Sequence, residues 1–124
     1  MLRSSLVAIG GLLGSLARYW LSGYVQQFSG SGFPFGTLVV NILGSFILGV
    51  VGALSLERGL LSQDARLFLG VGFCGGFTTM STFSYETVAL LRDGTFLSAF
   101  WNVSATIVSC FTGVWLGSAL GRVV

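Results

Sequence analysis

Four long apolar stretches occupy almost the whole of this 124-residue chain. Each stretch reaches the ~20 residues that an α-helix needs to cross a bilayer. Because 53% of the residues are hydrophobic and only 8% are charged, the composition is that of an integral membrane protein. The connections are short, which favours antiparallel neighbours in one bundle. We therefore expect an all-α membrane protein, a single transmembrane domain over 1–124, with four transmembrane helices at 5–25, 35–56, 67–91 and 96–120.

The third stretch contains a run of glycines followed by a run of hydroxyl residues. Residues 70–84 read Gly-Val-Gly-Phe-Cys-Gly-Gly-Phe-Thr-Thr-Met-Ser-Thr-Phe-Ser. Glycine weakens a helix, and threonine and serine side chains can replace missing backbone hydrogen bonds. Irregular backbone at membrane depth persists only where protein or an aqueous pathway surrounds it. We favour a third helix that is broken near residues 75–79 and forms an ion site; close packing through small residues is the alternative.

A break of this kind exposes backbone groups of both signs. The first half-helix would end in unpaired carbonyl oxygens, which attract cations, and the second would begin with unpaired amides, which favour anions. Four spans are few for enclosing a pathway, so we expect a two-fold homodimer in which two broken helices meet. Carbonyl oxygens from both subunits would then hold a monovalent cation on the axis without a carboxylate.

The second stretch carries polar side chains on one face. Thr37, Asn41 and Ser45 recur every four residues, which stacks them along one side of a helix. The Asn41 amide offers two hydrogens to an anion without bringing a negative charge. The alternative role for Asn41 is an interhelical hydrogen bond, worth about 1 kcal/mol or less in a membrane.

The fourth stretch repeats this pattern. Asn102, Thr106 and Cys110 lie four residues apart on one face. A second face carries small residues, which predict a packing seam with a neighbouring helix. Its glycines are Gly113, Gly117 and Gly121.

Beyond the expected break, Met80 and Phe83 share one face, with Ser81 and Thr82 beside them. Aromatic edges carry positive potential and tolerate an anion. Filling the bundle core is the alternative for such an apolar pair. The nearby hydroxyl run and Asn41 favour the anion site.

Two charged residues fall within the expected spans, where a charge must be paired or hydrated. Arg18 lies beside Tyr19 and Trp20, so it either extends to the headgroups, caps a helix end or lines a vestibule. Glu86 either lines a pore entrance or pairs near Arg92 at the helix end. Both are therefore candidate vestibule or structural residues.

The remaining charges and the cysteines exclude several functions. All basic residues are arginines, and most share one face of the expected bundle, which favours cytoplasmic termini. No arginine cluster indicates binding of nucleic acid. The chain has no histidine, and Cys74 and Cys110 both lie within spans, so neither a metal–thiolate site nor an enzyme is expected.

Three segments carry a specific combined pattern: Gly11-Leu-Leu-Gly-Ser-Leu-Ala-Arg-Tyr19, Gly36-Thr-Leu-Val-Val-Asn-Ile-Leu-Gly-Ser-Phe46 and Gly72-Phe-Cys-Gly-Gly-Phe-Thr-Thr-Met-Ser-Thr-Phe83. Together they resemble the Fluc-type fluoride channels of bacteria, and the resemblance covers all four spans. It implies an antiparallel dual-topology homodimer in the lipid bilayer of the bacterial inner membrane, with two fluoride pores and a central structural sodium ion. Its implied activity is passive fluoride export, which lowers fluoride toxicity.

The resemblance also implies roles for particular residues. Backbone carbonyls of Gly75 and Thr78 from both subunits would hold the sodium ion. The fluoride pathway would include Asn41, Met80, Ser81, Thr82, Phe83, Thr106 and Cys110. The family has two phenylalanines where this chain has Met80 and Phe83, so a polarizable thioether replaces the first ring.

Two other functions remain as alternatives. A small four-helix exporter of cationic drugs would have a similar length, but its coupling calls for a membrane-embedded carboxylate, where the first span offers Arg18. A purely structural membrane subunit would explain the glycine seam, although it would not explain Asn41 near a hydroxyl-rich break.

Overall fold

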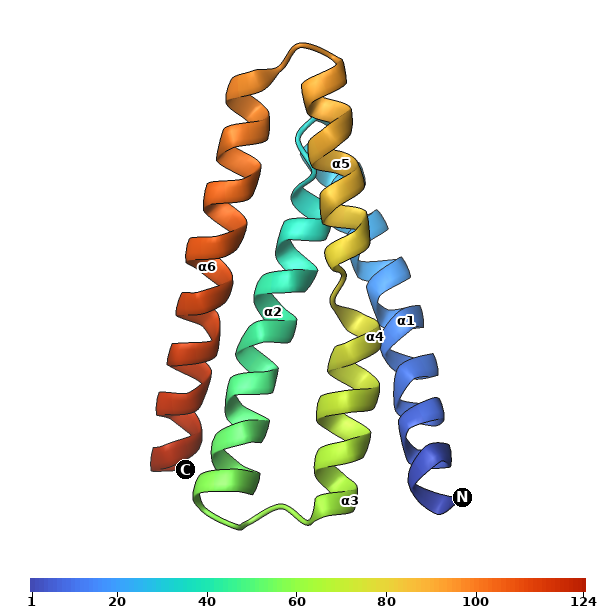
Figure 1. Cartoon of the computed structure of the whole chain (residues 1–124), viewed down its shortest axis with the longest axis vertical. Helices are drawn as coiled ribbons and strands as arrows, with labels where there is room; N and C mark the ends of the chain where they lie inside the picture. Colours follow the sequence, from blue (N-terminus) through green and yellow to red (C-terminus); the bar gives the residue numbers. More distant parts are fainter.

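The computed structural model describes residues 1–124, and all of its elements are helical. Because η1 continues α2, and α3 to α5 follow the course of one interrupted helix, the chain runs through the molecule as four long helices (Figure 1). The all-α fold with a broken third helix is therefore confirmed. The elements are α1 (Leu2–Ser29), α2 (Phe35–Gly52), η1 (Ala53–Glu57), α3 (Gln63–Arg66), η2 (Leu67–Cys74), α4 (Gly75–Phe77), α5 (Met80–Arg92) and α6 (Phe96–Val123).

The expected helix ranges lie within these helices, and each observed helix extends further. Three helices are long and apolar enough to cross a membrane: Phe35–Glu57, Gln63–Arg92 and Phe96–Val123. Helix α1 has the length, at 28 residues, but polar residues such as Arg18 make it less apolar. It ends where Gly30 takes a left-handed conformation, with φ of 59°, which favours glycine.

Helices consecutive in the chain run antiparallel, whereas the most closely packed pairs run parallel (Figure 1). Helix α2 packs along α6 on one side, and α1 packs along η2 and α4 on the other. Both termini and the loop between η1 and α3 lie at one end of the molecule (Figure 1). The break in the third helix, between α4 and α5, lies at mid-height, between α1 and α2 (Figure 1).

Close approach between α2 and α6 depends on glycine. A Cβ atom at Gly117 would collide with the Phe46 carbonyl oxygen, and one at Gly49 would collide with that of Val114. At Gly121 it would lie 2.7 Å from the Ala53 Cβ atom. The predicted packing seam on α6 is confirmed.

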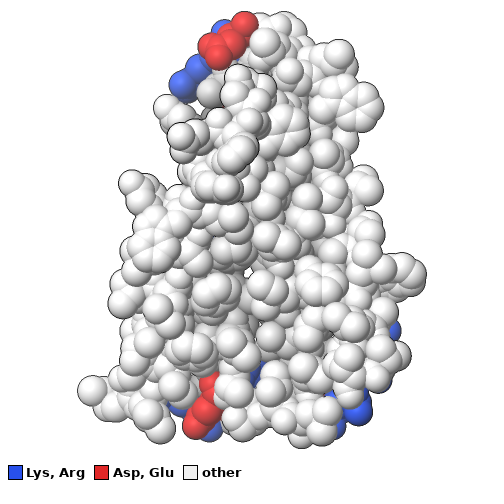
Figure 2. All heavy atoms as spheres, turned by 180° about the vertical axis from the view of Figure 1, so that it is seen from behind, with Lys and Arg blue, Asp and Glu red and all other residues white.

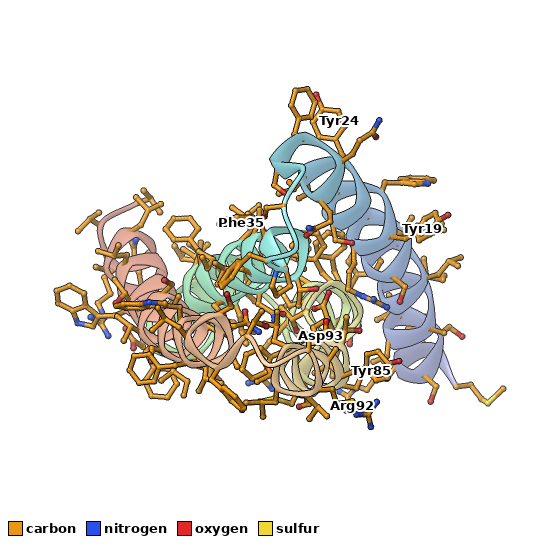
Figure 3. The ribbon with its side chains drawn as sticks, turned by 90° about the horizontal axis from the view of Figure 1, so that it is seen from above. Tyr19, Tyr24, Phe35, Tyr85, Arg92 and Asp93 are labelled. Atoms are coloured by element: carbon orange, nitrogen blue, oxygen red, sulfur yellow. The ribbon has the colours of Figure 1, made fainter.

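On the face drawn in Figure 2, charged side chains gather toward the two ends of the molecule and the middle is uncharged. At the end with the termini, Arg122 Nε lies 2.6 Å from Glu57 Oε2. At the other end, Arg92 and Asp93 lie together, and Tyr19 and Tyr24 point outward from α1 (Figure 3). An uncharged face is what the hydrocarbon core of a bilayer requires, and Arg18 is the exception inside the bundle, where it binds the Gly76 carbonyl near the break.

Candidate functional site

The third helix is interrupted at two consecutive threonines. Helix α4 ends at Phe77, Thr78 and Thr79 are extended, and α5 begins at Met80. The Thr79 side chain caps the second half-helix, because its Oγ1 accepts a hydrogen bond from the Thr82 amide at 3.1 Å. The predicted break near residues 75–79 is confirmed.

Asn41 on α2 holds the break from the side. Its Oδ1 accepts a hydrogen bond from the Thr79 amide at 2.8 Å, and its Nδ2 donates to the Thr79 carbonyl at 3.1 Å. Asn41 is only 8% exposed. The interhelical bond that the sequence left as an alternative is therefore present. This bond uses one of the two Nδ2 hydrogens, and the other remains available to donate a hydrogen bond.

Two carbonyl oxygens at the break lack their helical partners. The Thr79 amide would bond to the Gly75 carbonyl in a continuous helix, but here it bonds to Asn41. The Thr78 carbonyl accepts no backbone hydrogen bond. Gly75 is exposed and Thr78 is half-buried. These oxygens fit a hard cation held by backbone carbonyls, although one chain supplies only this pair.

Arg18 secures the other side of the break. Its Nε donates to the Gly76 carbonyl at 3.0 Å, so the guanidinium caps the end of the first half-helix. A cation at a helix C-terminus is favoured by the helix dipole. Of the roles weighed for Arg18, helix capping is the one that the structure shows. Gly76 permits this contact, because a Cβ there would lie 2.6 Å from the Gly11 carbonyl of α1.

A cavity of about 360 Å³ lies against the break, between α2, the third helix and α6. Thr106 is 9% exposed, and its Oγ1 is buried without a hydrogen-bond partner. A buried, unpaired hydroxyl costs free energy unless an acceptor or donor meets it. The cavity brings together seven of the predicted site residues: Asn41, Gly75, Thr78, Met80, Phe83, Thr106 and Cys110.

The other predicted residues lie outside this cavity. Ser81 and Thr82 belong to the first turn of α5, where Ser81 Oγ lies 3.3 Å from Thr79 Oγ1. Glu86 lines a separate cavity of about 260 Å³ together with Asp93. Its Oε1 is buried without a partner, and no ion pair joins it to Arg92.

Sequence reasoning missed the role of Thr79, which both caps α5 and binds Asn41. The signal was present, because a threonine directly before a helical segment is a typical N-cap. Asn102 also differs from its expected neighbours. Its Nδ2 donates to Thr87 Oγ1 at 2.9 Å, so it supports α5 and does not line the cavity.

Known proteins resemble this chain over nearly its full length. A sequence model of the family described as "CrcB-like protein, Camphor Resistance (CrcB)" matches residues 5–118. The protein named fluoride-specific ion channel FluC from Geobacter metallireducens is 48% identical over 122 residues, 98% of each chain. The protein of that name from Geobacter sulfurreducens is 48% identical over 94% of each chain. The protein of that name from Methylocella silvestris is 42% identical to this chain, over 90% of this chain and 86% of the Methylocella protein.

These matches agree with the helical fold and with its three membrane-spanning helices. The matched length includes α1 and the broken third helix, which carry the site. The chain is thus a multi-pass membrane protein that belongs to the CrcB-like family.

Proposed function

We propose that this protein is a fluoride-selective anion channel through which fluoride leaves the bacterial cell passively. The named relatives are fluoride-specific channels over almost the same length of chain. The structural observation that carries the proposal is the buried, unpartnered Thr106 hydroxyl in the cavity beside the helix break. No carboxylate lines that cavity, so the cavity lacks the carboxylate that a cation exporter needs for coupling.

The chemistry of the cavity suits a small anion. Fluoride is strongly hydrated, so a dry pathway must replace its water with hydrogen-bond donors. Thr106 Oγ1 and the remaining Nδ2 hydrogen of Asn41 are such donors. Phe83 offers a ring edge at the same cavity, whereas Met80, 72% exposed, places a polarizable thioether where the family resemblance implies the other ring.

Ser81 and Thr82 extend this donor set toward one end of α5. Both lie in the first turn of α5, and the Ser81 hydroxyl is exposed. Cys110, one turn beyond Thr106 on α6, continues the pathway in the other direction. The mechanism is diffusion down an electrochemical gradient, with donors placed in succession along the helices.

The carbonyl oxygens of Gly75 and Thr78 would hold a structural sodium ion, shared with a second copy of the chain. Their lost helical partners support this assignment. The bound ion would supply a fixed positive charge that raises the local potential for anions. Arg18 and Asn41 keep the two carbonyls in place by binding the backbone next to them, at Gly76 and at Thr79.

The functional unit would be an antiparallel, dual-topology homodimer in the inner membrane. Two features of the single chain support a second copy. The pair of carbonyls is too small a ligand set for a cation, and Met80 and Ser81 beside the break are exposed. A two-fold axis through the break would double the ligands and cover these residues.

Fluoride efflux from liposomes tests the proposed function. Purified protein is reconstituted, a potassium fluoride gradient is imposed, and efflux is followed with a fluoride electrode in the presence of valinomycin. We expect rapid efflux of fluoride, and chloride efflux at the level of protein-free liposomes. Transport of a cationic dye in place of fluoride would instead establish the exporter.

A further inference from the structure

Three sulfur-bearing side chains line the cavity at the helix break. Cys74 comes from η2, Met80 from α5 and Cys110 from α6. The chain contains only two cysteines and two methionines. Apart from Met1, every sulfur atom of the protein therefore belongs to this one cavity. Thiolate and thioether ligands select soft cations over hard ones.

The three sulfur residues differ in their access to the cavity. Met80 is 72% exposed, and Cys110 is half-buried. Cys74 is only 2% exposed within the packed first half of the broken helix. Cys110 and Met80 therefore line the cavity from two helices without being packed away, whereas Cys74 would need the helix to move.

A second observation points to a ligand beside Cys110. Thr106 lies one turn earlier on α6 and lines the same cavity, with its Oγ1 buried and unpartnered. A threonine hydroxyl can donate a hydrogen bond to a thiolate, which is the form of cysteine that binds metals. The unpaired Thr106 hydroxyl would thus stabilise the thiolate that metal binding creates.

The rest of the lining also favours a soft ion of low charge. None of the sixteen lining residues is charged. Hard divalent cations such as Mg²⁺ and Ca²⁺ need carboxylate oxygens, which this cavity lacks. A soft monovalent cation is weakly hydrated by comparison, and its charge is cancelled by a single thiolate.

We infer that the cavity is a binding site for a soft monovalent cation of the Ag⁺ and Cu⁺ class, with Cys110 Sγ and Met80 Sδ as its ligands. On binding, the Cys110 S–H bond breaks, an S–metal bond forms and the proton passes to water, while the metal keeps its oxidation state. The site itself stands on the structure alone. The consequence that a bound cation obstructs fluoride rests on the proposed function.

Equilibrium dialysis with Ag⁺ tests the site. The full-length protein is dialysed against silver nitrate in chloride-free buffer, since chloride would precipitate the metal. We expect one tight Ag⁺ per chain in the wild type, and loss of that binding in Cys110→Ser. Cys74→Ala is the matched control, because it removes the chain's other thiol, and it should bind Ag⁺ as the wild type does.

Met80→Leu separates a two-ligand site from a lone reactive thiol. In known metal sites, losing a residue that only hydrogen-bonds a ligand already lowers metal affinity about ten- to hundredfold. Met80 is proposed as a ligand itself, so we expect Met80→Leu to weaken Ag⁺ binding about tenfold or more. Equal affinity in Met80→Leu, or wild-type binding in Cys110→Ser, would overturn the assignment.

Fluoride efflux gives an independent second readout. Added Ag⁺ should stop efflux through the wild type and Cys74→Ala, and should leave Cys110→Ser with the efflux that this same variant shows before Ag⁺ is added. Efflux that continues through an Ag⁺-loaded wild type would overturn the inference of obstruction. A wild type without fluoride efflux would contradict the proposed function, whereas the dialysis would still decide the cation site.

Discussion

At the scale of single residues, two side chains hold the break in the third helix. Asn41 satisfies the Thr79 backbone from α2, and Arg18 satisfies the Gly76 carbonyl from α1. Buried backbone groups without partners are costly, so an interruption at this depth persists only because such side chains replace the missing bonds. Each of the two therefore stabilises the fold as well as shaping the site.

Replacing Arg18 should destabilise the protein. Arg18→Leu keeps an apolar side chain but leaves the half-buried Gly76 carbonyl without its charged donor, which costs about 1–3 kcal/mol. Thermal unfolding in detergent measures the change. Arg92→Leu removes an arginine at the exposed end of α5 and should change stability by less than about 0.5 kcal/mol. Equal midpoints for Arg18→Leu and the wild type would show that the hydrogen bond contributes nothing.

At the scale of elements, the sequence indicated the helices more fully than their contacts. The apolar stretches predicted every long helix, because length and hydropathy are properties of the chain itself. The glycine and hydroxyl run likewise predicted the break. Which residues meet at the break depends on helix rotation and packing. Asn102, on the same expected face as Thr106, binds Thr87 and stays outside the cavity.

The packing of α2 against α6 makes an element-level prediction. Gly117→Ala would press a methyl group into the Phe46 carbonyl, and overpacking of this kind costs about 1–3 kcal/mol. Gly23→Ala on α1 meets no atom within 4 Å and should be neutral or stabilising by up to about 1 kcal/mol, as alanine is the better helix former. The unfolding midpoint of Gly117→Ala should therefore fall, whereas that of Gly23→Ala should stay the same or rise. A Gly117→Ala midpoint at or above that of the wild type would contradict the seam.

At the scale of the whole molecule, the single chain leaves the site open. Gly75, Met80 and Ser81 are exposed beside the break, and the Thr78 carbonyl accepts no backbone hydrogen bond. A second copy related by a two-fold axis would complete the cation ligands and cover this surface. The sequence suggested this assembly only through the small number of spans and through the family resemblance, since an interface cannot be read from helix periodicity.

The assembly can be tested by mass. Native mass spectrometry of the purified protein should give twice the chain mass of 13.1 kDa. Replacing sodium with N-methylglucamine should lower the unfolding temperature, because the carbonyls of Gly75 and Thr78 would lose their cation. A monomeric mass, or a stability that does not depend on sodium, would contradict the shared cation site.

The most direct test of the account compares fluoride efflux through two asparagine variants. Asn41→Ala removes a buried amide that lines the cavity at the break, and Asn102→Ala removes a buried amide that does not. Both are measured in liposomes at equal protein content, after their oligomeric mass has been checked. The account predicts at least a tenfold loss of efflux in Asn41→Ala, about 1.4 kcal/mol or more, with Asn102→Ala close to the wild type. Wild-type efflux through a folded Asn41→Ala would show that fluoride does not pass through this cavity.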